Sequence, residues 1–154
     1  MKCRSQYNVH MKLKKQYKII QDVVQLVAGY FDLDVDVEIT TGKLSEGHQA
    51  EVGQECPGFY TIEYDKKFLT TAGIDDIIRI TAHEMVHVKQ YELDGLELTE
   101  QESIFRGKKW IGEYWFSPWE VEARGYELAF QQHYLYYGSD NAKAAAAKPV
   151  SYTV

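Results

Sequence analysis

Cysteine, positive charge and long apolar runs are all scarce in this sequence of 154 residues. Its two cysteines, Cys3 and Cys56, lie far apart and form no C-x-x-C pair. A zinc site built from cysteines and a disulfide-rich secreted scaffold are therefore both disfavoured, and free thiols are expected. Polar residues interrupt the apolar segment Ile19–Gly29, which disfavours a signal peptide, and no run is long enough to span a bilayer. We therefore expect a cytoplasmic protein without membrane contacts.

The formal net charge of −6 disfavours a protein that binds nucleic acid by neutralising phosphates, and no such partner is expected. The basic run Lys12–Lys18 falls on a segment with helical periodicity, where such a run is usually a solvated face. The chain length and an apolar content of 45% suit one domain with a single core. We predict this domain over residues 1–138 and a flexible or loosely docked tail over 139–154.

Changes of hydrophobic period along the chain predict an α+β fold. In chain order we expect a helix over 9–30, strands over 33–39, 49–56 and 58–65, a helix over 74–93, a hairpin or lid over 96–116 and a helix over 117–137. Pro57, just before Gly58–Asp65, favours an edge position for that strand, because proline cannot donate to a ladder. The predicted architecture is a small antiparallel sheet of about three strands, packed with an N-terminal, a central and a C-terminal helix.

The segment TAHEMVHVKQY in the central helix contains the pattern H-E-x-x-H at His83, Glu84 and His87. Residues four apart lie one above the other on a helix, so both imidazoles face the same side. The apolar residues of this helix centre on the opposite side, which makes the histidine face polar rather than part of the core. Two imidazole nitrogens can then bind one metal ion, with Glu84 within reach of a metal-bound water. The alternative interpretation is a solvated polar face that happens to hold two histidines.

A third ligand must come from another segment, and the start of the last helix offers two carboxylates. Glu120 and Glu122 flank the apolar stripe of that helix on either side, so periodicity does not choose between them. Ser117 and Glu120 also have the spacing of a capping box, which would occupy Glu120 and leave Glu122 free. His133 is the only histidine that follows the pair in the sequence. We expect its polar ring at the surface of the last helix rather than at the metal.

The string SPWEVEAR, residues 117–124, resembles the third-ligand segment of the gluzincin group of zinc peptidases, in which a small residue follows the ligand glutamate three positions on. Similar P-W-E-x-E-A strings follow H-E-x-x-H in small metallopeptidase-like proteins from phages and bacteria. The resemblance covers about two thirds of the chain. It implies a zincin-like domain and one Zn²⁺ per chain, held by His83, His87 and Glu120, with Glu122 as the alternative third ligand.

The sequence departs from the gluzincin pattern at Arg124, which stands four residues after Glu120. The group usually has an aspartate there, which orients a ligand histidine through its second ring nitrogen. Another acceptor must therefore take that role in this chain. Asp76, Glu127 or a backbone carbonyl are the candidates.

The resemblance implies a zinc-dependent peptidase in which Glu84 is the general base that accepts a proton from the attacking water. The oxyanion that develops on the substrate needs donors besides the metal. The side chains considered for this role are Tyr114, Arg124, Tyr126 and His133. A peptide or protein substrate would lie extended along the predicted edge strand Gly58–Asp65, through main-chain hydrogen bonds.

Two other functions compete with this one. A catalytically silent structural or interaction protein could keep a peptidase-like fold, for instance as a phage component in the host cytoplasm or the virion. An SprT-like protease that acts on DNA-bound proteins is disfavoured by the acidic charge and by the lack of a cysteine-rich zinc ribbon. The sequence does not indicate the oligomeric state.

Overall fold

The computed structural model describes residues 2–5 and 13–138, which form an α+β fold, as the sequence predicts. The predicted tail over 139–154 and the predicted helix start at Val9 lie outside the described residues. The helices are α1 (Lys14–Tyr30), α2 (Lys66–Thr71), α3 (Ile74–Leu93), the 3₁₀ turn η2 (Tyr114–Phe116) and α4 (Pro118–Tyr137). The strands are β1 (Lys2–Ser5), β2 (Asp36–Gly42), β3 (Ala50–Cys56), β4 (Phe59–Asp65), β5 (Glu97–Leu98), β6 (Ser103–Phe105) and β7 (Lys108–Trp110).

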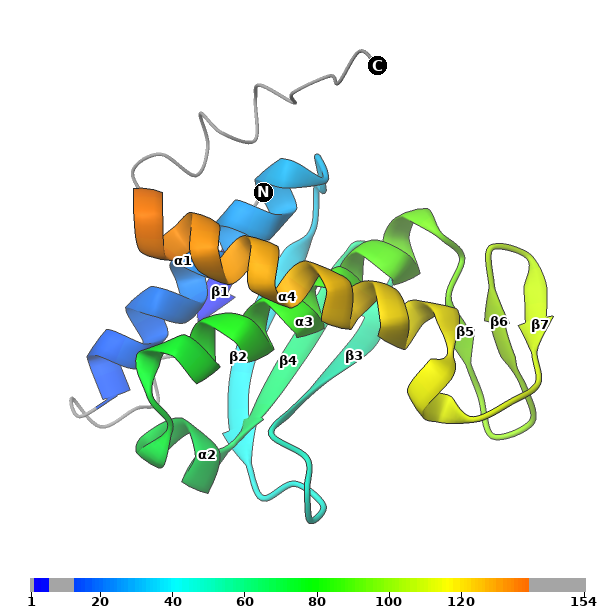
Figure 1. Ribbon diagram of the computed structural model, residues 1–154, viewed down its shortest axis with the longest axis horizontal. Helices are drawn as coiled ribbons and strands as arrows, with labels where there is room; N and C mark the ends of the chain where they lie inside the picture. The colour runs from blue at the N-terminus through cyan, green and yellow to red at the C-terminus, as the bar shows by residue number, and fades with distance from the viewer. Residues whose placement is uncertain (1, 6–12, 139–154) are drawn as a thin grey trace.

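The larger sheet has the strand order β1-β2-β4-β3, with α1 and α3 packed on one face and α4 packed across both helices (Figure 1). The strand β2 runs parallel to β1 and β4, and only the pair β3–β4 is antiparallel. The predicted antiparallel sheet of about three strands is therefore a mixed sheet of four. The reason is that β3 lies at the edge, so the chain returns through a hairpin and inserts β4 beside β2 in the same direction.

The prediction that Gly58–Asp65 forms an edge strand is wrong, because β4 lies between β2 and β3. Pro57 sits in the turn that joins β3 to β4, outside the ladder, and Gly58 completes this turn with a φ of 84°. The missing N–H of proline is therefore no obstacle to a central position of β4. Strand β3 is the edge that lies beside the HExxH helix α3.

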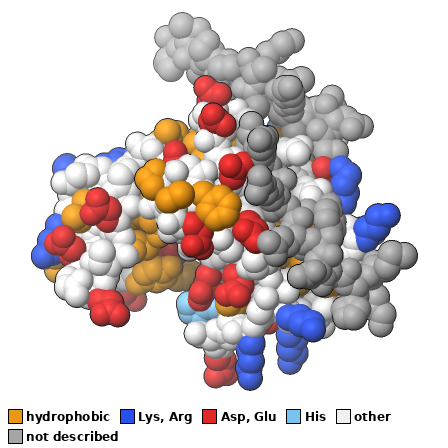
Figure 2. All heavy atoms as spheres, turned by 180° about the vertical axis from the view of Figure 1, so that it is seen from behind, with side chains coloured by type: hydrophobic (Ala, Val, Ile, Leu, Met, Phe, Trp, Pro, Cys, Tyr) orange, Lys and Arg blue, Asp and Glu red, His pale blue; other side chains and the backbone are white. Residues whose placement is uncertain are grey.

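Alternation along the strands separates the two faces of the sheet. Val37 and Ile39 of β2 are fully buried against the helices, as are the inward side chains of β4. The intervening residues of β2 include Asp36 and Glu38, which are only partly buried. Figure 2 looks onto the molecule from behind this sheet and shows carboxylate side chains across it. The helices thus cover one face only, and the core lies between that face and α1 and α3.

Helix α3 spans the residues that the sequence predicts, Ile74–Leu93. Ile77, Ile78 and Met85 are buried on its core side. Two residues after the end of the helix, Gly95 has a φ of 64°, and the N–H of Leu96 donates to the Gln90 carbonyl at 3.1 Å. None of the helices in the described part of the chain combines the length and apolar character needed to cross a membrane.

A second, smaller sheet of β5, β6 and β7 follows α3. The predicted hairpin around Gly107 is present, and its two-residue turn at Arg106 and Gly107 has positive φ at both positions, 53° and 76°. A small apolar cluster of Leu96, Phe105 and Trp119 joins this sheet to the start of α4. The first turn of α4 is therefore held by this second cluster rather than by the main core.

Candidate metal site

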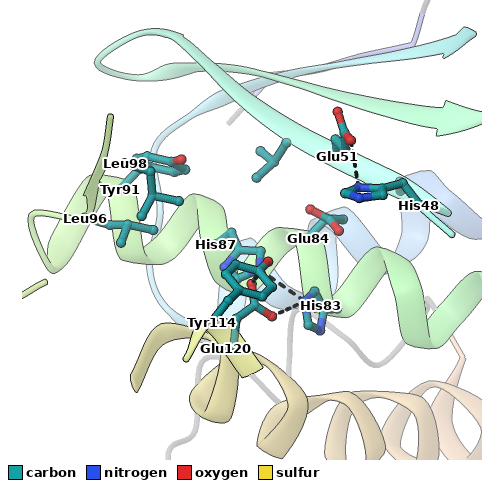
Figure 3. Close-up of a pocket in the computed structure, with 12 residues that line it drawn as sticks. His48, Glu51, His83, Glu84, His87, Tyr91, Leu96, Leu98, Tyr114 and Glu120 are labelled. Atoms are coloured by element: carbon teal, nitrogen blue, oxygen red, sulfur yellow. Dashed lines mark hydrogen bonds and ion pairs between the residues drawn. The ribbon is translucent and has the colours of Figure 1, made fainter. Parts of the chain in front are cut away.

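Helix α3 and the first turn of α4 bring two histidines and one glutamate together (Figure 3). The Nε2 atoms of His83 and His87 lie 3.1 Å apart. Glu120 places Oε2 at 3.2 Å from His83 Nε2 and Oε1 at 3.0 Å from His87 Nε2. One ligand atom from each residue lies within 4.8 Å of the others. At these distances the three residues form a group that could hold a metal ion.

The other glutamate of α4 faces a different set of partners. Glu122 Oε1 lies 3.0 Å from Lys89 Nζ, and its Oε2 accepts from Arg106 Nη2 at 2.8 Å. Glu120 and Glu122 face different partners because residues two positions apart on a helix point about 200° apart around its axis. Glu120 does not cap its helix either, since the N-cap Ser117 makes no capping bond and its hydroxyl donates to the Tyr114 carbonyl at 2.7 Å.

The second nitrogen of each histidine has an acceptor of its own. His83 Nδ1 lies 2.6 Å from Glu127 Oε1, and His87 Nδ1 lies 2.7 Å from Gln90 Oε1. Gln90 Nε2 donates to the Trp119 carbonyl at 2.8 Å, which turns the amide oxygen toward His87. Both Nδ1 atoms therefore donate to these acceptors, and both Nε2 atoms face the same side, where a metal ion would displace any proton that they carry. Such outer partners orient metal-binding histidines.

Of the two named acceptors considered from the sequence, Glu127 contacts His83 and Asp76 does not. Asp76 Oδ1 instead lies 3.4 Å from Arg79 Nη2. Arg79 Nη1 donates to Glu127 Oε2 at 3.2 Å, so the arginine links the two carboxylates. Asp76 thus reaches the histidine only through Arg79 and Glu127.

Burial and mutual contacts set the charges of the site. Burial alone would raise the pKa of Glu120, but hydrogen bonds from His83 and His87 outweigh it and hold this pKa well below its usual value. Burial lowers the pKa of His83, but its contacts with Glu120 and Glu127 outweigh this and raise the pKa to about 9. The group is thus charged at neutral pH, and carboxylates compensate the buried positive charge.

Glu84 lies beside this group and lines the same cavity, which has a volume of about 240 Å³. Its side chain is buried, and burial raises its pKa to about 7, although the charges of His87 and His83 act in the opposite direction. A carboxyl group with this pKa exchanges protons readily near neutral pH, which is the property that a general base requires.

Tyr114 and Arg124, two of the side chains considered as donors to the oxyanion, lie near the group but already donate hydrogen bonds to other residues. The Tyr114 hydroxyl donates to Glu120 Oε1 at 2.6 Å, and its pKa is raised by burial and by this contact. Arg124 lies over the Trp115 ring, 3.9 Å from its centroid, and Nη2 donates to the Trp115 carbonyl. Both side chains lie at the rim formed by η2 and the start of α4.

Tyr126 and His133, the other two side chains considered as donors to the oxyanion, lie further along α4. Tyr126 packs among aromatic rings, 5.2 Å from Phe31 and 5.6 Å from Phe130 between centroids. His133 lies against Tyr137, with ring centroids 4.8 Å apart. Neither residue is among the described residues that line the cavity at the histidines.

Sequence reasoning missed two residues near the group, Gln90 and His48. Gln90 had a signal, because it follows His87 by three positions and lies on the same polar face of α3. His48 had none, because it belongs to the loop before β3 and reaches the cavity only through the pairing of the sheet. Comparison with protein-family models, with curated proteins and with solved structures found no match to this chain.

Proposed function

We propose that this protein is a zinc-dependent peptidase of the gluzincin type. The observation that carries the proposal is the convergence of His83, His87 and Glu120 within 4.8 Å, with Glu84 in the same cavity. Two imidazoles and one carboxylate are a common set of protein ligands in catalytic zinc sites, which keep a fourth position open for water or substrate. The contacts of Glu127 and Gln90 with the histidine Nδ1 atoms fit such a set.

The residues of the chain divide the chemistry between them. When bound, Zn²⁺ would lower the pKa of a water molecule and polarise the substrate carbonyl. Glu84 accepts the proton of the attacking water and then delivers it to the leaving amine. Burial raises the pKa of its carboxyl group to about 7, so that both transfers are accessible near pH 7.

A peptide or protein substrate would lie along β3, the exposed edge of the larger sheet. Ala50, Glu51 and Val52 of this strand line the same cavity as Glu84 and the histidines. An extended peptide can add to such an edge through main-chain hydrogen bonds, which tolerate varied side chains. This proposal assigns to β3 the substrate-binding role that the sequence analysis expected for Gly58–Asp65, the segment that forms β4.

The test is hydrolysis of an unfolded protein by the zinc-loaded chain and by Glu84→Gln. The variant should bind one Zn²⁺ per chain, as measured by atomic absorption, and lose about 10²–10⁴-fold in kcat. The change Glu100→Gln is a matched control, because Glu100 is an exposed carboxylate between β5 and β6 that lines neither cavity at the histidines. A wild-type chain that binds zinc and cleaves nothing would refute the proposal.

That outcome would favour the second candidate function, a catalytically silent protein that keeps the fold and the metal group. Its supporting observation is that Tyr114 and Arg124, the two predicted donors nearest the group, are occupied by Glu120 and by the Trp115 carbonyl. A silent protein would lose folding stability with its metal and would show no dependence on Glu84.

A further inference from the structure

Hydrolysis of a peptide bond places negative charge on the carbonyl oxygen, and enzymes stabilise it with a donor aimed at that position. The two predicted donors closest to the metal group are already engaged, Tyr114 with Glu120 and Arg124 with the Trp115 carbonyl. Tyr126 and His133 lie away from the cavity. Tyr114 and Arg124 line the cavity but direct these donors to Glu120 and Trp115, so a donor from another element fits the proposed reaction better.

His48 lies on the opposite wall of the cleft, in the loop that leads into β3 (Figure 3). It lines the cavity of about 240 Å³ at the histidines and also a neighbouring one of about 380 Å³. His83, Glu84 and Glu120 line both of these cavities as well. A substrate held between the helices and β3 would thus pass between His48 and Glu84.

A carboxylate fixes the orientation of this ring. His48 Nδ1 lies 2.8 Å from Glu51 Oε1, and the two side chains are 55% and 48% exposed. Because a carboxylate only accepts, Nδ1 donates to Glu51, and Nε2 is the nitrogen left for another partner. In the protonated ring Nε2 is also a donor, and a charged donor makes a stronger hydrogen bond than a neutral one.

We propose that His48, in its protonated form, is a catalytic residue that donates a hydrogen bond from Nε2 to the oxyanion of the substrate, with Glu51 as its positioning residue. This inference rests on the proposed peptidase function. The hydrogen bond strengthens as negative charge develops on the carbonyl oxygen, and the proton stays on His48. The proton balance of hydrolysis remains with Glu84.

Tyr91 is the rival donor, because its side chain also lines the cavity at the histidines. It lies one turn beyond His87 on α3, and its ring is 6.1 Å from that of Tyr60. The second cavity that it lines is formed with Gln54 and Leu98, away from His83 and Glu84. His48 shares both of its cavities with the metal group, which favours it over Tyr91.

The experiment compares His48→Ala, His48→Gln and Tyr91→Phe in the zinc-loaded chain. His48→Ala should lose about 10²-fold in kcat with little change in KM or zinc content. His48→Gln should recover part of this loss, since its amide is a neutral donor. A phosphonamidate peptide, whose tetrahedral phosphoryl group imitates the oxyanion, should bind His48→Ala more weakly by calorimetry, independently of turnover.

Glu51→Gln should reduce kcat less than His48→Ala and should leave zinc binding unchanged. Glu46→Ala, an exposed change in the same loop, and Glu100→Gln, an exposed change between β5 and β6, are the controls and should behave as wild type. Equal activity and equal phosphonamidate affinity of wild type and His48→Ala would overturn the inference and leave the peptidase proposal intact. A large loss in Tyr91→Phe alone would transfer the role to Tyr91. A wild-type chain without hydrolysis would overturn both proposals.

Discussion

The cleft has a helical wall, formed by α3 and α4, and a strand wall, formed by β3 and the loop before it, and the two walls differ in burial. On the helical wall, His87 and Glu120 are buried, and the Nδ1 atoms of both histidines are held by acceptors from α3 and α4. On the strand wall, His48 and Glu51 are about half exposed and contact each other. The helical wall is thus held in place by its own contacts, while the strand wall is open to solvent.

This difference matches two kinds of binding. A metal ion needs ligand atoms at fixed positions, and supporting contacts reduce the cost of ordering them. A substrate that enters and leaves needs an accessible edge with free hydrogen-bonding groups. We therefore expect changes in the helical wall to alter metal affinity, and changes in the strand wall to alter turnover with the metal retained.

Substitution of the third ligand should have the largest effect on the helical wall. Glu120→Ala leaves two imidazoles and should abolish stoichiometric zinc binding, and with it all hydrolysis. Zinc content after dialysis and cleavage of an unfolded protein measure the two effects. Full zinc occupancy of Glu120→Ala would show that another residue supplies the third ligand.

Glu122→Ala is the matched control on the same helix, and it should keep the metal. The variant removes the partner of Lys89 and Arg106, although Asp94 still pairs with both. It also removes one acceptor of the Gln90 amide, which keeps its bond to the Trp119 carbonyl. We expect a loss of about 1–2 kcal/mol in the free energy of unfolding, measured by urea denaturation. Loss of zinc from a folded Glu122→Ala chain would contradict the assignment of Glu120.

The outer contact of His83 should have a smaller effect. Glu127→Gln keeps the shape of the side chain but weakens the hydrogen bond to Nδ1, and we expect zinc affinity to fall by about 10–100-fold. Competition with a chromophoric chelator measures this change. Asp76→Asn is its control, since Asp76 reaches the histidine only through Arg79 and Glu127, and equal losses in both variants would argue against a direct role of Glu127.

The smallest effect is expected at the rim between the two walls. Tyr114→Phe removes the hydroxyl that donates to Glu120 Oε1 at 2.6 Å but keeps the ring. Zinc should still bind, with an affinity reduced by less than about 10-fold, because the histidines keep both of their outer contacts. Calorimetric titration with zinc checks this, and complete loss of binding would place Tyr114 among the metal ligands.

Local periodicity was enough to predict much of the helical wall. The bounds of α3 and its polar face follow from residues within one segment, which a 3.6-residue period captures. The sequence could not choose between Glu120 and Glu122, because both flank the apolar stripe of α4. Trp119 decides the rotation of the helix by packing with Leu96 and Phe105, and this contact joins segments distant in the sequence.

The strand wall was harder to predict for the same physical reason. The segments of β3 and β4 were found from their alternation, but their order in the sheet depends on pairing with β2 and on the short strand β1, which carried no clear pattern. Parallel strands pair through residues that are distant in the sequence, so local sequence patterns do not reveal which strands are neighbours. His48 could therefore be recognised only once β3 was placed at the edge.

The second apolar cluster holds Glu120 of the candidate metal site through contacts that the two histidines do not share. Glu120 follows directly after Trp119, which is anchored in that cluster, whereas both histidines stand on a helix anchored in the main core. Ala123 and Phe130 fix the rest of α4 in the main core, so substitutions in the second cluster would shift Glu120 only slightly relative to the two imidazoles while the main core stays intact. Substitutions around Leu96, Phe105 and Trp119 are therefore a route by which a protein engineer could alter the spacing of the three candidate ligands without disturbing the main core.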